Sequence, residues 1–466
     1  MGRDGKNREF RRNSSAHGGN DQRRVKRKNC SSYWCMTQTR TNLYKALYPL
    51  VSTGAKLFFK RLQIVGLENL PKDKPVLIVA NHQNAMMDPV ICCVLMPKQL
   101  HWLTRADVFK KPAISKLLHQ FNMLPVYRER DKVGDLAGKN DATFQECYAR
   151  LEAQAIVCMF PEGTHRGKKQ LHLPLKKGSA RLALGAFDFG EKSKELVIVP
   201  VGLDYANYYT YRSDLLVKVG KPIAVADYWK QAQQDQARAI TSLMNDQRTG
   251  LSSVMIDIQD EESYEALLSL RELSDALCEK TSLSSEFDQY QKLCQNWVAQ
   301  DSKEQWNQKA NRFIDLKNAG GITKSNERSV FWQWIAAPLL LLLGLPYALL
   351  AALVFSPMYY GIEKFVLNTA KDPLFYNSLR MSFWTFLTPI YLLIIGCANG
   401  LLIQDWVMGG IIVATVVLCG LISLEWWSIF AEWKNNIRLR KYLQTTKGKE
   451  WKQLRDELKT RIKQLV

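Results

Sequence analysis

The first candidate for chemistry is a histidine followed by an aspartate at the end of an apolar run. His82 comes directly after the run 76–80, and Asp88 follows six positions later. A histidine at the end of a strand can accept the proton of a hydroxyl group while that oxygen attacks a carbonyl carbon. An aspartate on the other ring nitrogen holds the tautomer that this role requires. The two residues predict a general base; the alternative interpretation is a helix-capping aspartate beside a surface histidine.

Three further blocks offer cations and a tight turn. The second block, residues 121–128, ends at Arg128, and the fourth, residues 199–203, is an apolar Val-Pro-Val-Gly-Leu sequence. Arginine presents a planar fork of donors that suits a phosphate group. Glycine permits a turn that brings backbone amides close to a ligand. The third block also follows an apolar run, and its polar part consists of Glu162, Gly163, Thr164, His165 and Arg166.

Taken in this order and spacing, the four blocks resemble the glycerolipid acyltransferase family of the plsC type, over about residues 60–225. That family is known for a His-x4-Asp motif, an arginine-ended second motif, a Pro-Glu-Gly third motif and an apolar Val-Pro fourth motif. The resemblance implies an α/β domain, acyl-CoA or acyl carrier protein as the acyl donor, and direct transfer without an acyl-enzyme. It also implies that no metal and no cofactor takes part.

The resemblance assigns roles to individual residues as well. His82 is the expected general base, Asp88 its orienting partner, and Arg128 a ligand of the acceptor's phosphate. The third block departs from the commoner Glu-Gly-Thr-Arg pattern because a histidine stands directly before its arginine. The other expected acceptor-site residues are Glu162, Gly163, Thr164 and Arg166.

The first block departs from the family's pattern too, because five residues rather than four separate His82 from Asp88. One extra residue on a regular helix would turn the aspartate by about 100°, so the loop after His82 must bulge by one residue. The longer spacing is similar to that of the fungal dual-substrate glycerol-3-phosphate and dihydroxyacetone-phosphate acyltransferases, which also carry a C-terminal membrane region. This favours transfer to the sn-1 hydroxyl of one of those two acceptors, an early step of phospholipid synthesis.

Two other functions are compatible with these blocks. A 1-acylglycerol-3-phosphate acyltransferase would apply the same residues to a lipid acceptor, and the motifs do not separate the two. A non-catalytic membrane protein that binds lipid could keep the same fold, although the intact His82, Asp88, Arg128 and Glu162 weigh against it. A transporter is disfavoured, because the apolar runs carry no pair of buried charges that would mark a pathway.

A sheet is needed to position these blocks. Short apolar runs alternate with helix-sized segments between residues 41 and 229, which predicts an α/β domain with a mainly parallel sheet flanked by helices. Ahead of the first run, residues 42–64 carry apolar side chains at helical intervals and predict an amphipathic helix or a pair of helices. The predicted strands are residues 75–80, 101–104, 155–160, 197–201 and 215–219.

Polar segments flank this domain. Residues 1–40 form a basic tail that is too polar to fold, and translation could begin at Met1 or at Met36. Residues 230–328, rich in Gln, Glu, Lys and Ser, predict a polar helical subdomain that acts as a spacer or cap. Residues 434–466 form a basic amphipathic tail. Its last helix, residues 451–466, is predicted to lie on a membrane surface, and packing against the protein is the alternative.

Residues 329–433 are predicted to form membrane helices. Residues 329–362 contain no charged side chain, whereas one span needs only about 20 residues. The runs 381–404 and 406–424 predict a tight helical hairpin that turns at Asp405. Basic residues flank the spans and place both the C-terminus and the loop 363–380 in the cytoplasm, and the acyltransferase domain is expected to face the cytoplasm as well. The run 329–362 must then enter and return on one side, as a hairpin bent near residues 344–346.

The charge of the chain narrows the range of partners. The formal net charge is +20, and most of the excess lies in residues 1–35 and 434–466. Beside membrane spans, such an excess favours contact with anionic lipid head groups over nucleic acid. The ten cysteines and six histidines show no clustered spacing of the kind that binds zinc. The expected partners are therefore a lipid membrane, an acyl thioester donor and a glycerol-phosphate-type acceptor, without nucleic acid.

Overall fold

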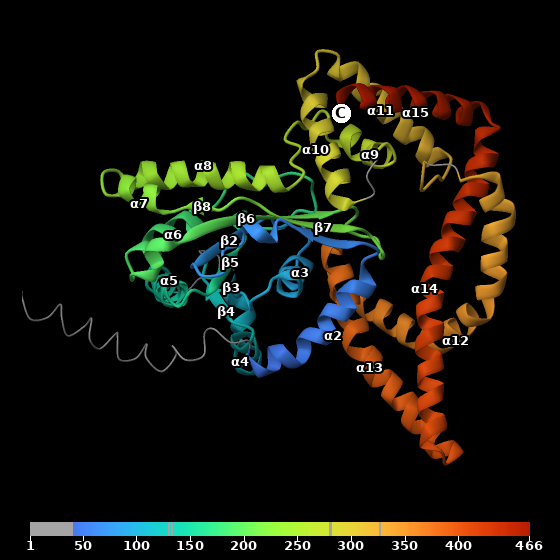
Figure 1. Cartoon of the computed structure of the whole chain (residues 1–466), viewed down its shortest axis with the longest axis horizontal. Coiled ribbons are helices and arrows are strands. Elements are labelled where there is room, and N and C mark those ends of the chain that lie inside the picture. The colour runs from blue at the N-terminus through green and yellow to red at the C-terminus, as the bar shows by residue number, and fades with distance from the viewer. Residues whose placement is uncertain (1–40, 129–130, 132–133, 279–281, 326–327) are drawn as a thin grey trace, which may run out of the picture.

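The structure is a computed structural model that describes residues 41–128, 131, 134–278, 282–325 and 328–466. The predicted basic tail, residues 1–40, and the choice between Met1 and Met36 lie outside the described residues. Figure 1 shows an α/β domain, a group of shorter helices above it, and long helices at its side.

An eight-stranded sheet forms the centre of the α/β domain. The strand order is β1-β7-β6-β2-β5-β3-β4, with β8 paired to β6. All neighbouring strands run parallel except the pairs β6–β7 and β6–β8. The predicted mainly parallel sheet is therefore confirmed. The strands are β1 Leu62–Val65, β2 Val76–Ala80, β3 His101–Arg105, β4 Met123–Val126, β5 Ile156–Met159, β6 Val197–Tyr205, β7 Leu215–Val219 and β8 Ile223–Ala224.

Helices cover both faces of this sheet, which explains why central strands such as β2 are apolar along their whole length and buried at every residue. One face packs against α2 and α3, and the other packs against α5, α6 and α8. The helices of this domain are α2 Asn42–Phe58, α3 Met87–Leu95, α4 Pro112–Gln120, α5 Leu136–Glu152, α6 Gly178–Phe187, α7 Ala226–Ala232 and α8 Gln236–Val254.

Two sheet edges differ from the expectation. The predicted helix over residues 42–64 is wrong beyond Phe58, because Leu62–Val65 forms β1 and pairs with β7. Its β-branched Ile64 and Val65 suit an extended chain once a neighbouring strand is available. Strand β4 was not predicted, since Pro125 lies inside it. Proline is tolerated there because β4 pairs only with β3, at the edge of the sheet.

The helical subdomain has its own apolar core, built by α9 Tyr264–Asp275, α10 Leu283–Ala299 and α11 Lys303–Ala319. The C-terminal helix α15, Thr446–Leu465, joins the same core. Its Trp451 is fully buried and stacks on Phe313 of α11, with ring centroids 5.5 Å apart. The predicted membrane-surface position of this helix is therefore wrong. The alternative, packing against the protein, is correct, because the apolar side chains of α15 are buried against α11.

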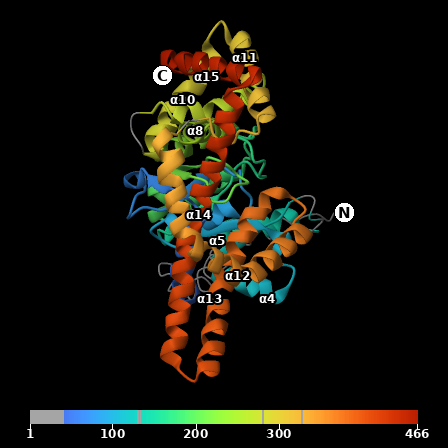
Figure 2. The same ribbon diagram turned by 90° about the vertical axis from the view of Figure 1, so that its right-hand side faces the viewer.

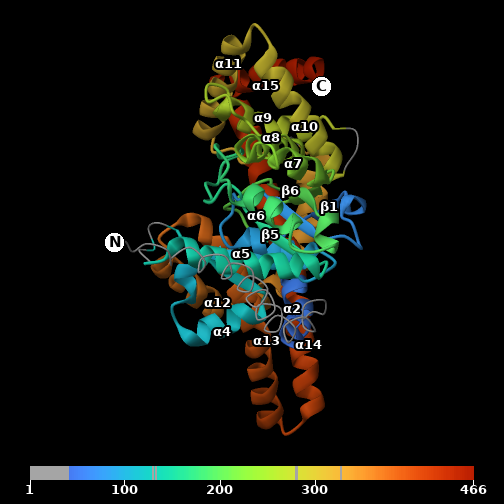
Figure 3. The same cartoon turned by 90° about the vertical axis from the view of Figure 1, so that its left-hand side faces the viewer.

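Among the described residues, three helices are long and apolar enough to cross a membrane: α12 Ala337–Thr369, α13 Tyr376–Ile403 and α14 Trp406–Leu443. The last two form the predicted hairpin. Its turn contains Gln404, which has a φ of +56°, and Asp405, whose carboxylate caps α14 by accepting from the backbone N–H of Val407 and Met408. Figures 2 and 3 show from opposite sides that this pair projects away from the rest of the protein.

The predicted hairpin within residues 329–362 is wrong. Pro346 lies inside α12, and the helix continues from Ala337 to Thr369 without reversing. Figure 1 shows α12 as a curved helix beside α14. A proline removes one backbone hydrogen bond and bends a helix, but a helix packed along its length can absorb that bend.

Candidate active site

The loop between β2 and α3 positions the first block. It begins at Asn81, which is fully buried, and the amide of this side chain exchanges two hydrogen bonds with the backbone of Leu203 in β6 (3.1 and 2.7 Å). An asparagine amide can donate and accept at once, so it replaces a backbone pair where the strand ladder stops. His82 therefore leaves the sheet at a fixed point between β2 and β6.

His82 and Asp88 form the pair that was expected. The Nδ1 atom of His82 lies 2.9 Å from Oδ2 of Asp88, whose side chain is fully buried in the first turn of α3. The same oxygen accepts hydrogen bonds from the backbone N–H groups of Gln83 and Asn84 (2.9 and 2.8 Å). Since a carboxylate only accepts, Nδ1 carries the proton and Nε2 is left with a free lone pair. The imidazole is in the tautomer that a base needs.

The extra residue between the two partners is accommodated in the loop, as the spacing required. Residues 81–85 are not helical, and Ala85 has a φ of +41°. The left-handed region is unfavourable for alanine, and here it lets the chain turn so that Asp88 returns to the histidine. A fourth donor fixes the carboxylate: the hydroxyl of Tyr205, at the end of β6, lies 2.7 Å from Oδ1 of Asp88.

Glu162 of the third block lies behind the histidine and is 1% exposed. Its Oε1 accepts the backbone N–H of His82 at 2.6 Å, and its Oε2 accepts the backbone N–H of His172 at 2.8 Å. Burial raises the pKa of Glu162 to about 7, against the two hydrogen bonds that lower it. Both carboxylate oxygens are thus engaged by the protein's own backbone. In this geometry Glu162 connects the third block to the first by a hydrogen bond.

Aromatic rings enclose the histidine. The ring of Phe160 stacks on His82 with centroids 4.1 Å apart, and the ring of His165 meets it edge-on at 5.4 Å. His165 in turn places Nε2 3.0 Å from Oδ2 of Asp372 and its ring against Phe375. The last two residues belong to the connection between α12 and α13. The connection between α12 and α13 therefore contacts the third block directly.

The remaining residues of the third block lie at the surface of this site. Gly163 has a φ of +70°, which a side chain would strain, and Thr164 and Arg166 are exposed. The guanidinium of Arg166 comes within 3.3 Å of the ring of His172. Partial burial, together with the charges of Arg166 and Lys176, lowers the pKa of His172. A cationic, solvent-facing patch thus borders the buried pair.

Arg128 lies apart from the others. It follows β4, which β3 and β5 separate from β2, so the structure does not place it beside His82. Its guanidinium is 3.1 Å from Asp131 and 3.6 Å from Asp107. The predicted phosphate ligand is therefore held by two carboxylates at the outer edge of the sheet.

Two residues that touch this site were not predicted. Tyr205 lies two positions beyond the fourth block, in a strand four residues longer than the predicted one. The apolar run could have been extended to it. Asp372 is 207 positions away from its partner His165, and nothing in the sequence connects the two.

Comparison with known proteins gives matches to the part of the chain that carries this site. The family model described as Acyltransferase matches residues 61–204, less than half of the chain but including both the first and third blocks. Glycerol-3-phosphate O-acyltransferase 1 from Saccharomyces cerevisiae is 30% identical over 135 residues, which are 28% of this chain and 17% of that protein. The chain thus matches less than a fifth of the yeast protein.

Two bacterial proteins are similar as well. The 1-acyl-sn-glycerol-3-phosphate acyltransferase from Bacillus subtilis is 21% identical over 187 residues, 40% of this chain and 84% of that protein. The crystal structure of the 1-acyl-sn-glycerophosphate (LPA) acyltransferase PlsC from Thermotoga maritima superimposes with a TM-score of 0.32 at 16% identity, covering 49% of this chain and 89% of that one. Residues 61–204 of the chain therefore form an acyltransferase domain, as the resemblance of the four blocks implied.

Proposed function

We propose that the chain moves a fatty acyl group from acyl-CoA, or from acyl carrier protein, to the sn-1 hydroxyl of glycerol-3-phosphate or dihydroxyacetone phosphate. The observation that carries the proposal is the geometry of His82, whose Nδ1 is bound to the buried Asp88 at 2.9 Å. This leaves Nε2 as the proton acceptor. The yeast protein named glycerol-3-phosphate O-acyltransferase 1 supports the choice of acceptor.

The proposed reaction has two steps. Nε2 of His82 takes the proton of the acceptor hydroxyl while its oxygen forms a bond to the thioester carbonyl carbon, and the carbonyl electron pair moves to oxygen. The pair then returns, the carbon–sulfur bond breaks, and the thiolate takes the proton from the imidazolium. Asp88 stabilises the imidazolium between these steps. No acyl-enzyme forms, and atoms and charges balance without a metal or a cofactor.

Arg166, Thr164 and the backbone of Gly163 are proposed to bind the acceptor beside His82, with Arg128 as a further phosphate ligand. Arginine binds phosphate through two parallel hydrogen bonds. The exposure of Arg166 supports its role, because a charged acceptor arrives from water. For Arg128, the acceptor's phosphate must compete with Asp107 and Asp131.

A membrane position with the acyltransferase domain on the cytoplasmic side is part of the proposal. The segments before and after α12 support a one-sided arrangement. Ahead of the helix Ser325 hydrogen-bonds to Glu272 of α9 (Oγ–Oε2 3.2 Å), and after it Asp372 binds His165. Both flanking segments thus bind the part of the protein outside the three long helices. The helix α12 itself, at about 1.5 Å per residue, is nevertheless long enough to cross a bilayer.

Cysteine labelling in sealed vesicles tests this arrangement. Lys324→Cys and Lys371→Cys place exposed thiols before and after α12, in a background whose native cysteines are replaced. We expect both to react from the same side with a reagent that cannot cross the membrane. Reaction from opposite sides would show that α12 crosses the bilayer.

A second candidate function is 1-acylglycerol-3-phosphate acylation. The Bacillus subtilis relative of that name is matched over 84% of its length and favours it. Purified protein supplied with acyl-CoA and, in turn, glycerol-3-phosphate, dihydroxyacetone phosphate or lysophosphatidate decides between the two. We expect faster turnover with the first two acceptors. Exclusive use of lysophosphatidate would establish the second function, and no turnover with any acceptor would contradict both.

A further inference from the structure

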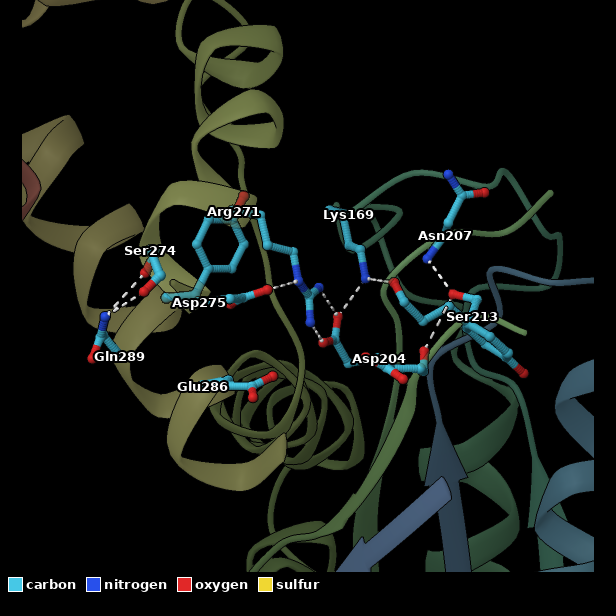
Figure 4. A network of polar contacts seen from close by, with 12 residues as sticks. Lys169, Asp204, Asn207, Ser213, Arg271, Ser274, Asp275, Glu286 and Gln289 are labelled. Carbon is cyan, nitrogen blue, oxygen red and sulfur yellow. Dashed lines mark hydrogen bonds and ion pairs between the residues drawn. The ribbon is translucent and has the colours of Figure 1, made fainter. Parts of the chain in front are cut away.

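Three charged side chains meet in the interior between the sheet and the helical subdomain (Figure 4). Asp204 of β6 is 2% exposed, and Lys169, from the loop after the third block, is 4% exposed. Arg271 of α9 reaches Asp204 with both terminal nitrogens, at 3.1 and 2.6 Å, and Lys169 binds the same carboxylate. One carboxylate is thus shared by two cations that come from different parts of the chain.

Burial makes this cluster sensitive to the loss of any one member. These charges are largely shielded from water, so each depends on the others for its stabilisation. Burial lowers the pKa of Lys169 to about 8 and raises that of Asp275, 3.8 Å from Arg271, to about 7. A second ion pair, from Arg61 to Glu286 of α10, joins the same two bodies nearby. The helical subdomain is therefore fixed to the sheet.

Asp204 of the cluster directly precedes Tyr205, whose hydroxyl contacts Asp88 of the His82–Asp88 pair. Neighbouring residues of a strand point to opposite faces of a sheet, so Asp204 faces the helical subdomain while Tyr205 faces α3. The hydroxyl of Tyr205 donates to Asp88, and its backbone carbonyl accepts from Lys169 on the other side. The charge cluster thus binds the backbone of Tyr205 at the end of β6. The side chain of the same residue binds Asp88.

We propose that Tyr205 is a positioning residue for the His82–Asp88 pair, and that Arg271 acts through Asp204 to keep it in place. The helical subdomain is then part of the catalytic apparatus rather than a spacer or cap. This inference rests on the proposed function, because it assigns a role within that reaction. It predicts that changes in α9, outside the acyltransferase domain, slow acyl transfer without weakening substrate binding.

Tyr205→Phe removes only the hydroxyl and leaves Oδ1 of Asp88 without its donor. A hydrogen bond to a charged group changes a rate by roughly tenfold to a hundredfold, so kcat should fall by that factor while KM for acceptor and donor stays the same. Tyr228→Phe is the matched control, because its hydroxyl also binds an aspartate, Asp246, but on α7 and α8. The control should keep wild-type kcat and KM.

Arg271→Met and Arg271→Lys test the anchor. We expect Arg271→Met to lower kcat at least tenfold per folded molecule. Arg271→Lys should lower kcat less, because a positive charge remains at position 271. Arg312→Met is the control, since Arg312 makes a two-pronged pair with Glu450 in the same subdomain, at the surface. Folded protein is counted by gel filtration and thermal unfolding.

Wild-type turnover distinguishes a failure of the positioning role from a failure of the proposed function. If the wild type transfers acyl groups and Tyr205→Phe and Arg271→Met do so at the same rate per folded molecule, the cluster is only structural and the positioning role is wrong. An increase in KM with unchanged kcat would also contradict it. If the wild type itself transfers no acyl group, the proposed function fails, and the role of Tyr205 falls with it.

Discussion

The two halves of the candidate site differ in how firmly their side chains are held. In the inner half, Asp88 is fully buried with four donors on its two oxygens, and Glu162 has both oxygens bound to backbone N–H groups. In the outer half, Arg166 is exposed, and Arg128 is paired with two aspartates at the sheet edge. The proton-transfer groups are therefore arranged in advance, whereas Arg166 is free to move and Arg128 must leave its aspartates to bind a ligand.

The difference suits a reaction between an anionic acceptor and a thioester. A base must be aligned with the attacking oxygen to within a few tenths of an ångström, and a rigid surround supplies this alignment. The exposed Arg166 can instead follow a small phosphate as it enters from water. Changes to the inner half should affect turnover, and changes to the outer half should affect acceptor binding.

The largest effect is expected at the centre of the inner half. His82→Ala removes the base, and general-base catalysis contributes roughly 10²- to 10⁴-fold, so kcat should fall by that factor in a protein that still folds. Asp88→Asn should also be damaging, because an amide cannot stabilise the imidazolium. His119→Ala, on the exposed surface of α4, is the control. If His165→Ala abolishes turnover and His82→Ala does not, the base has been misassigned.

Glu162 provides a pH test of the same half. Its folded pKa of about 7 lies above the ordinary value of 4.5, so the folded state holds a proton between these values that the unfolded state has lost. The wild type should therefore lose stability relative to Glu162→Gln as pH rises from about 4.5 to 7, by up to roughly 3 kcal/mol, and the difference should level off above pH 7. Thermal unfolding of both proteins in detergent measures this. A difference that grows in favour of the wild type with pH would contradict the assignment.

Arg128 tests the outer half. Arg128→Ala should raise the KM for the acceptor roughly tenfold to a hundredfold and leave donor binding unchanged, because a charge-assisted hydrogen bond is worth about 1.5 to 3 kcal/mol. Arg166→Ala should act in the same direction, and exposed Arg181→Ala on α6 is the control. Steady-state kinetics with each substrate varied in turn gives both constants. Weakened donor binding with an unchanged acceptor constant would reverse the assignment.

The smallest effect is expected where the two halves meet the membrane-region helices. The Asp372 side chain is 43% exposed, so its pair with His165 is screened by water and contributes little. Asp372→Asn should change the acceptor KM less than about fivefold, and a double-mutant cycle with His165→Ala should give a small coupling. A loss of turnover comparable to that of His82→Ala would mean that this connection belongs to the firmly held inner half.

The sequence predicted the residues of the inner half better than the residues that hold them in position. The His82 and Asp88 pair, including the loop that absorbs one extra residue, followed from residue types and local spacing. The roles of Tyr205 and Arg271 were not predicted, because the partners of both residues lie far away in the chain. Only the folded structure brings them together. The position of α15 was also missed, since an amphipathic stripe is the same whether lipid or a helix such as α11 covers it.

The prediction for the apolar run 329–362 failed for the same reason, which is that the outcome depends on a distant partner. Composition predicted correctly that residues 329–362 are helical and apolar. It did not show that the helix continues through Pro346, because packing against α14 decides whether a proline bends a helix or ends it. Positions that depend on local chemistry were predictable, and those that depend on distant partners were not.

The most direct test of the central claim is whether thiol release from the donor depends on the acceptor. Purified protein is mixed with acyl-CoA, with and without glycerol-3-phosphate, and both free CoA and acylated protein are measured within one turnover. Direct transfer by His82 predicts one CoA for each acylated glycerol-3-phosphate, no release without acceptor, and neither in His82→Ala. A burst of CoA without acceptor, with the acyl group on the protein, would contradict it.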